Sequence, residues 1–252
     1  MKVLLSPAKS LDFETPVSVI QTSTAQFLEK AAQVNAVLRK KSPKQLRALM
    51  GISEHLAVLN YERNQLWESH SAPGQNRPAV FAFNGEVYRG LNVSTLPESK
   101  HEFMQNTLRI LSGQYGLLRP LDEIMPYRLE MGTKLAIGKS KNLYEFWQSA
   151  VTSILNEELK NNELIVNLAS NEYAKCLDFK SIKNPLITPV FKEYRNGVYK
   201  VLAVYAKYAR GLMARYILDH NVQKLDELTS FDLDGYQFSA DLSDKEQLVF
   251  VR

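Results

Sequence analysis

Residues 164–173 read LIVNLASNEY, a short apolar run followed at once by small and polar residues. The same pattern occurs near the start of the chain, where KVLL at 2–5 precedes SPAKS at 6–10. Runs that are apolar at nearly every position, instead of every second one, are typical of strands covered by helices on both faces. The pattern predicts an α/β fold of the mixed α+β kind, with a central, mostly mixed sheet surrounded by helices.

Further apolar runs complete the predicted sheet. Together with Lys2–Leu5 and Leu164–Leu168, the expected strands are Ala79–Phe83, Leu108–Leu111, Val198–Tyr205 and Gln247–Val251, with a hairpin turn at Asp234-Gly235. The five runs before residue 206 each end in a cluster of small or polar residues. The carboxyl ends of parallel strands border a ligand crevice, so these five clusters would face one cleft. Turns need the same residue types for backbone reasons alone, and this purely structural explanation stays open.

Several helix starts are marked by capping residues. Ser42, Pro43 and Gln45 combine an N-cap, a proline at the first helical position and a capping box. Capping-box spacing or helical periodicity also marks Thr95–Glu98, Asn142–Glu145 and Ala25–Lys40.

The composition limits the class of protein. The 252 residues are 45% hydrophobic and 23% charged with a net charge of +4, and we expect residues 1–252 to form one globular domain. The lone Cys176 excludes an intrachain disulfide, and the four scattered histidines lack metal-ligand spacing, so neither a metal nor a cofactor is expected. The first apolar run ends after Leu5 and no stretch is long enough to span a bilayer, which predicts a cytoplasmic protein without membrane contact.

The segment 42–67 resembles a helix-hairpin-helix motif. A helix from Pro43 to about Leu49 would be followed by Met50-Gly51-Ile52-Ser53 and by a second helix from Glu54. Such a hairpin exposes backbone N–H groups beside a helix N-terminus, where they bind phosphate oxygens without reading bases. The candidate DNA contacts in this segment are Lys44, Arg47, Gly51 and Ser53. Ser53 stands where the motif has a second glycine, and two helices joined by a glycine turn are also common without DNA.

A second candidate anion site lies in the run YAKYARG at 205–211. If a strand ends at Tyr205, Lys207 and Arg210 fall in the first turn of the following helix, where cations oppose the helix dipole. A bound phosphate would reverse that cost, and Gly211 would leave room beside Lys207 on the same helical face. The alternative is that both cations pair with acids such as Glu86 or Glu172.

Six segments together resemble the bacterial peroxide stress proteins of the YaaA family. They are LLSPAKSLD at 4–12, FNGEVYRGL at 83–91, LSGQYGLLR at 111–119, MPYRLEM at 125–131, NLASNEY at 167–173 and AKYARGLMAR at 206–215. The resemblance implies a cytosolic protein with an unusual α/β fold that protects against hydrogen peroxide and lowers free intracellular iron. It also implies a helix-hairpin-helix and a positively charged cleft that bind duplex or branched DNA. Because the sequence has no iron-ligand cluster, an effect on iron would be indirect.

The favoured interpretation is therefore a non-enzymatic, monomeric protein that binds double-stranded or branched DNA with little sequence preference. The cations expected to line or border its cleft are Lys9, Arg128, Lys175, Lys207, Arg210 and Arg215. The alternative is an enzyme acting on a nucleobase, nucleotide or nucleic acid in the same cleft. It would use Glu86, Tyr115 and Glu172 as acid–base groups, with Lys207 holding a phosphate. Cys176 is expected to be a packed core residue, with peroxide sensing as the lesser alternative.

Overall fold

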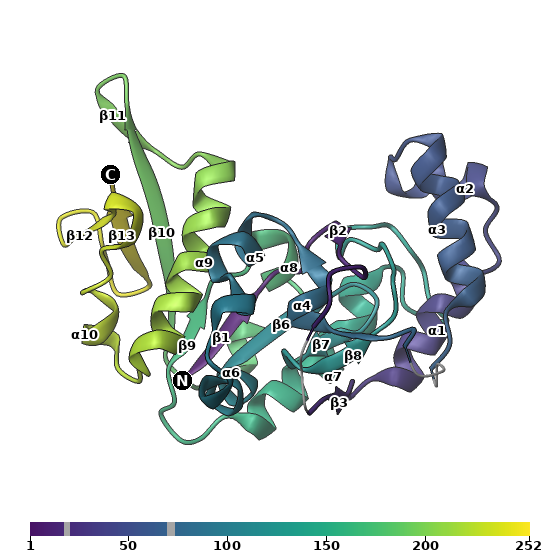
Figure 1. The fold of residues 1–252 in the computed structure, drawn as a ribbon, viewed down its shortest axis with the longest axis horizontal. Coiled ribbons are helices and arrows are strands. Elements are labelled where there is room, and N and C mark those ends of the chain that lie inside the picture. Colours follow the sequence, from purple (N-terminus) through teal and green to yellow (C-terminus); the bar gives the residue numbers. More distant parts are fainter. Residues whose placement is uncertain (18–20, 70–73) are drawn as a thin grey trace.

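The structure is a computed structural model that describes residues 1–17, 21–69 and 74–252. Within these ranges the main sheet has eight strands in the order β12-β13-β10-β9-β1-β6-β7, with β11 paired to β10 (Figure 1). Their bounds are β1 Lys2–Leu5, β6 Leu108–Ser112, β7 Gly116–Leu118, β9 Ile165–Asn167, β10 Leu186–Arg195, β11 Val198–Lys200, β12 Gln237–Ser239 and β13 Gln247–Val251. The strands from β6 to β13 along this order run parallel, whereas β7, β11 and β12 are antiparallel to their neighbours. The predicted mixed sheet is thus confirmed.

Helices and two small sheets surround this centre. The helices are α1 Leu28–Leu38, α2 Pro43–Met50, α3 Glu54–Leu66, α4 Ala79–Ala82, α5 Glu86–Leu91, α6 His101–Thr107, α7 Leu143–Glu158, α8 Asn171–Ala174, α9 Ala203–His220 and α10 Leu225–Leu228. Short 3-10 turns are η1 Val93–Thr95, η2 Glu98–Lys100, η3 Phe179–Ser181 and η4 Leu233–Gly235. The small sheets pair β2 Ser10–Leu11 with β5 Phe83–Asn84, and β8 Asp122–Ile124 with β3 Ser23–Thr24 and β4 Arg77–Pro78. No helix of the described ranges has the length and apolarity that crossing a membrane requires.

Four of the local predictions are wrong. Residues 79–82 form helix α4, because a short apolar run does not distinguish a buried helix from a strand. The strand expected at Val198–Tyr205 ends at Lys200, and α9 begins at Ala203. The Asp234-Gly235 pair belongs to η4 rather than to a hairpin turn, since β12 starts only afterwards. Thr95 and Glu98 lie in separate 3-10 turns rather than in one capping box.

Strand β10 was not predicted, although it is the longest strand that the structure describes. Pro189 lies inside it, and a proline usually argues against a central strand because it has no N–H to donate. Beyond Ile187, however, β10 has left its ladder with β9, and Pro189 is paired only with Leu248 of β13. The missing donor therefore costs β10 no ladder bond on the β9 side. Beyond Lys192 the strand leaves the sheet with β11 as an exposed hairpin (Figure 1).

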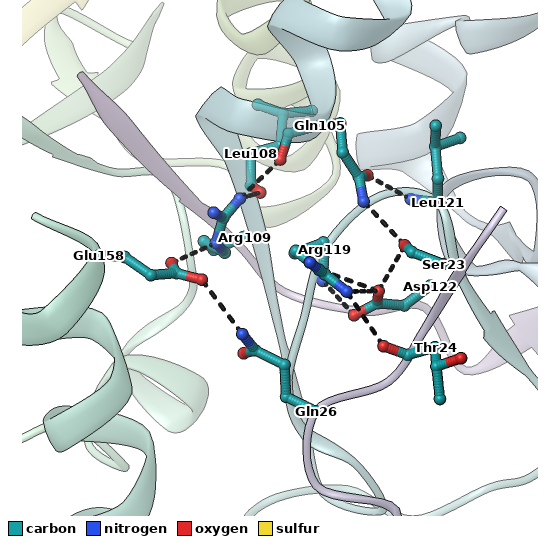
Figure 2. A network of polar contacts seen from close by, with 10 residues as sticks. All are labelled: Ser23, Thr24, Gln26, Gln105, Leu108, Arg109, Arg119, Leu121, Asp122 and Glu158. Atoms are coloured by element: carbon teal, nitrogen blue, oxygen red, sulfur yellow. Dashed lines mark hydrogen bonds and ion pairs between the residues drawn. The ribbon is translucent and has the colours of Figure 1, made fainter. Parts of the chain in front are cut away.

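A buried polar network fastens the small β3-β8-β4 sheet to the centre (Figure 2). The carboxylate of Asp122 is fully buried and accepts hydrogen bonds from Ser23 Oγ at 2.7 Å and from Arg119 N at 2.8 Å. Burial raises the pKa of Asp122, and these donors act in the opposite direction. Close by, Arg109 on β6 pairs with Glu158 on α7 at 2.6 Å, which fixes a helix against the sheet.

Helices α5 and α9 approach each other with their backbones in contact, because each has a glycine at the crossing. A Cβ on Gly211 would lie 1.9 Å from the carbonyl oxygen of Val87, and one on Gly90 would lie 2.3 Å from that of Tyr208. Gly211 thus serves helix packing, instead of leaving space for an anion beside Lys207. This contact sets where the polar residues of α5 lie relative to those of α9.

Replacement of Gly211 by alanine should force the two backbones apart. We expect Gly211→Ala to lower the free energy of unfolding by about 2 kcal/mol or more, because the contacted atoms belong to the backbone and no rotamer relieves the clash. Urea unfolding measures the change. Gly138→Ala is the control, since Gly138 has φ +57° but open space around it, and it should cost only about 1–2 kcal/mol of backbone strain. Equal stability of wild type and Gly211→Ala would contradict the close crossing.

Candidate functional site

A polar pocket of about 150 Å³ lies beyond the carboxyl ends of β1 and β9, between α5, α8 and α9. Four of the five predicted strand-end clusters contribute to it. Its lining residues are Ser6, Pro7, Ala8, Lys9, Gly85, Glu86, Val87, Tyr88, Glu130, Ser170, Glu172, Tyr173, Lys207 and Arg210. The pocket forms because β1 and β9 are parallel neighbours, so the residues that follow them leave the sheet at the same edge.

The fifth cluster, residues 112–116, lies in the core and does not reach the pocket. Tyr115 is buried, and its hydroxyl accepts hydrogen bonds from Trp67 Nε1 at 2.8 Å and from Met125 N at 3.0 Å. Burial raises the pKa of Tyr115 to about 12. Both its position and its protonation contradict the acid–base role expected for Tyr115.

Hydrogen bonds between the chain segments shape one wall of the pocket. The Ser6 hydroxyl accepts from Ser170 N at 2.9 Å, which ties the end of β1 to the N-terminus of α8. Tyr88 on α5 donates to the Ser6 carbonyl oxygen at 3.0 Å. Burial raises the pKa values of Tyr88 and Tyr173 well above the usual tyrosine value. Both phenols therefore stay neutral and offer the pocket uncharged aromatic surface.

Three carboxylates line the pocket, and each has at least one identified partner group. Glu130 forms ion pairs with Lys9 at 2.7 Å and with Arg128 at 3.2 Å. Glu172 Oε1 accepts from Gly132 N at 2.9 Å. Glu86 Oε1 pairs with Arg89 on the next turn of α5 at 2.7 Å. Glu130 was not singled out from the sequence, although it lies in the segment MPYRLEM that carries part of the family resemblance.

Lys207 and Arg210 line the pocket from α9 without neutralisation. Among the described residues, neither side chain has a hydrogen bond or an ion pair. The pKa of Arg210 is lowered by burial, which means that its charge is held partly away from water. The alternative that they pair with Glu86 or Glu172 is therefore wrong. Because α9 begins at Ala203, both cations lie beyond its first turn, and the predicted helix-terminus anion site is wrong in that detail.

A second concentration of positive charge extends toward α3. Arg128 lines a hollow that shares Pro7, Ala8, Lys9, Glu130 and Tyr173 with the pocket. Arg63 on α3 lies close enough to Arg128 that the neighbouring charge, together with burial, lowers the pKa of Arg63. Arg63 has no side-chain partner among the described residues, and Arg128 Nε is buried without an acceptor. The carboxylate of Glu130 thus pairs with two cations, Lys9 and Arg128, and no ion pair of Arg63 is found among the described residues.

The sequence does not single out Arg63 as a binding residue, because the negative charge of the adjacent Glu62 offsets its positive charge in a local count. Two other cations that were expected to line or border the cleft are not among the residues that line the pocket. Lys175 is exposed at the end of α8 and does not line the pocket. Arg215 pairs with Asp219 at 2.8 Å and donates to Thr95 Oγ1 at 2.7 Å, so it fastens α9 to the chain after α5.

Helices α2 and α3 form the hairpin predicted over residues 42–67, at one end of the molecule (Figure 1). Ser42 and Gln45 make the expected capping box, and Gly51 ends α2 in the left-handed conformation with φ +61°. Ser53 has φ −65° and caps α3 by accepting from Leu56 N, so the position does not need a second glycine. Lys44 and Arg47 are exposed on α2.

No group of three or more His, Cys, Asp or Glu side chains within residues 1–17, 21–69 and 74–252 is placed to hold a metal ion. Cys176 is fully buried, and burial raises the pKa of its thiol to about 12. Reaction with peroxide requires the thiolate, so this environment disfavours a sensing role.

We therefore expect native Cys176 to resist thiol reagents at pH 7 to 9, where the folded protein keeps it protonated and covered. Labelling should become fast in denaturant, where the thiol returns to its ordinary pKa. Absorbance of a chromogenic disulfide reagent measures both rates. Rapid labelling of the native protein would contradict the burial of this residue.

Comparison with known proteins identifies the family of this chain. The family model described as peroxide stress protein YaaA matches residues 1–242. A UPF0246 protein of Flavobacterium johnsoniae is 50% identical over 252 residues, which cover all of both chains. A UPF0246 protein of Saccharophagus degradans is 47% identical over 254 residues, covering all of this chain and 99% of the relative. With a family model over nearly the whole chain and relatives of this identity, the chain belongs to the family of peroxide stress proteins YaaA.

Proposed function

We propose that this member of the peroxide stress family binds duplex or branched DNA with little sequence preference, and that it does so in the cytoplasm during oxidative stress. The observation that carries the proposal is the unneutralised charge around the pocket. Lys207 and Arg210 lack partners among the described residues, and the charge of Arg128, which pairs with Glu130, also acts on the partly buried Arg63. Like charges repel one another, most strongly where they are partly buried as at Arg210 and Arg63, and a bound polyanion would compensate this repulsion.

The α2–α3 hairpin supports the same proposal. The first-turn N–H groups of a helix have no partner within the helix, and at α3 they follow an exposed, glycine-containing turn. Lys44 and Arg47 add positive charge on α2. Because Arg63 lies on α3 and Arg128 beside the pocket, the hairpin and the pocket are connected by cations. A phosphate backbone held along this path would be recognised by charge and shape rather than by its bases.

A second candidate function is an enzyme that acts on a nucleobase, nucleotide or nucleic acid. The favouring observation is that Glu86, Glu130 and Glu172 line the same pocket as the cations. Carboxylates weaken phosphate binding, so a surface that only holds a DNA backbone gains nothing from them. Glu86 and Glu172 would be the acid–base candidates and Lys207 the phosphate contact, with Tyr115 no longer included.

The DNA-binding proposal predicts a steep dependence of affinity on salt. Fluorescence anisotropy with a labelled duplex should give a logarithm of the association constant that falls linearly with the logarithm of salt concentration, by about 0.9 for each phosphate contact. The double variant Lys207→Gln/Arg210→Gln should reduce the steepness of this fall by about 2, and Arg63→Gln by about 1. The reason is that each cation removed takes away one phosphate contact.

Lys245→Gln is the matched control, because Lys245 is exposed on the connection between β12 and β13. It should leave the slope unchanged, and circular dichroism should give unchanged unfolding midpoints for all these variants. A slope of zero for the wild type, or no binding to any duplex or junction, would refute DNA binding. A slope lowered equally by Lys245→Gln would refute the assignment to the pocket.

We further propose that any effect of the protein on intracellular iron is indirect. Anaerobic titration of the purified chain with ferrous iron should give no tight, stoichiometric binding, since the described residues offer no ligand cluster. A saturable one-to-one isotherm with ferrous iron would contradict this proposal and would point to direct iron binding.

A further inference from the structure

The pocket divides into parts with different chemistry. Lys207 and Arg210 line only its main hollow, whereas Arg128 lines only the adjoining one. Between them lie the groups that both hollows share, including Tyr173 and the Lys9–Glu130 ion pair. The cations therefore fall into two sets, each lining one hollow, and the groups common to both hollows include an aromatic ring and a neutralised charge pair.

The pocket as a whole has the size of one ring rather than of a helix of nucleic acid. A cavity of about 150 Å³ accommodates a single six-membered ring. Tyr88, Tyr173 and Val87 give it apolar surface, and the phenols are held neutral by burial. A planar, uncharged group would fit these walls, while a phosphate would be repelled by the carboxylates.

Two of these carboxylates keep an oxygen available. Glu172 Oε1 and Glu86 Oε1 carry the bonds to Gly132 and Arg89, whereas neither Oε2 atom has a hydrogen bond among the described residues. An ionised carboxylate only accepts hydrogen bonds, so a ligand that faces these oxygens would have to offer N–H or O–H donors. The amino and imino groups of a nucleobase and the hydroxyls of a sugar are such donors.

We propose that the pocket takes one nucleotide unit, with its base or sugar against Glu86, Glu172 and Tyr173 and its phosphate on Lys207 and Arg210. The inference rests on the proposed DNA binding for its preferred source. The second cation set at Arg128 and Arg63 would hold the next phosphate, which favours a nucleotide turned out of a strand over a free one. In this arrangement the carboxylates face the uncharged part of the ligand. This gives them a role that binding of a DNA backbone alone does not.

The test uses duplexes that carry 2-aminopurine at a central position, either paired with thymine or opposite a mismatch. The emission of this base is quenched by stacking, so its transfer into the pocket should raise the emission several-fold on binding. Ala8→Leu fills the pocket from the segment after β1 and should abolish the rise, while duplex affinity measured by anisotropy stays within about threefold because the phosphate contacts remain.

Ala203→Leu is the control, since Ala203 is exposed at the start of α9 and does not line the pocket. It should keep both the emission change and the affinity. If Ala8→Leu unfolds, the smaller Ala8→Val takes its place, with a partial loss of the emission change expected. Calorimetric titration with deoxyadenosine monophosphate forms the second arm and tests a free nucleotide as the source.

The outcomes separate the two proposals. A rise in emission that Ala8→Leu removes supports a nucleotide turned out of the strand. Salt-dependent duplex binding without any emission change, together with no binding of the free nucleotide, overturns the pocket inference and leaves DNA binding standing. Binding of the free nucleotide without DNA binding supports the pocket and refutes the proposed function. Absence of all three signals refutes both.

Discussion

The backbones of α5 and α9 touch at Gly90 and Gly211, and the pocket owes its width to this contact. Glu86 and Tyr88 come from one helix and Lys207 and Arg210 from the other, so the separation of the helices sets the separation of acids from cations. Side chains at either glycine would increase that separation. Arg215 works in the same direction, because its bonds to Asp219 and Thr95 hold α9 against the segment that follows α5.

Charge in this site is divided unevenly. On one side, Lys9 and Arg128 share Glu130, and on the other Lys207 and Arg210 have no acid at all among the described residues. An unpaired, partly desolvated guanidinium costs the folded protein stability, as the lowered pKa of Arg210 indicates. Such a cost is common where a protein is prepared for a charged ligand, because the ligand then replaces both water and the missing partner. The carboxylates restrict which ligand can bind, because an anionic group of the ligand must lie away from them.

The sequence predicts much of this arrangement where the signal is local. The capping residues at Ser42 and Asn142, the left-handed Gly51 and the parallel strands β1, β6 and β9 follow from side-chain chemistry and from patterns within a few residues. The convergence of the two clusters after β1 and β9 follows from parallel pairing, whereas the clusters at 84–90 and 206–211 reach the pocket through the crossing of α5 and α9. The connection to peroxide stress came from the resemblance to the family. No pattern of charge or hydrophobicity in the sequence predicts it.

The rest depends on contacts between distant segments. Nothing near Arg63 indicates that it meets Arg128, and nothing near Tyr115 indicates that Trp67 and Met125 cover its hydroxyl. Gly211 was expected to make room for a ligand but makes room for Val87, since a glycine on a helix face does not reveal what approaches it. Strand β10 was not predicted because Pro189 lies in it. A strand tolerates a proline only where no neighbouring strand needs its N–H, and this depends on which strands pair at that position.

The hairpin of β10 and β11 ends the main sheet with a free edge, and its design affects how the protein behaves at high concentration. Tyr194 and Tyr199 lie opposite each other there with their rings 5.2 Å apart, exposed together with Val198. An apolar edge of this kind invites strand pairing between molecules, which leads to aggregation. Strand β11 is only three residues long and carries Lys200 at its end, so a second copy finds few ladder bonds and a repelling charge. The short strand and its terminal lysine thus oppose intermolecular strand pairing at this exposed apolar edge.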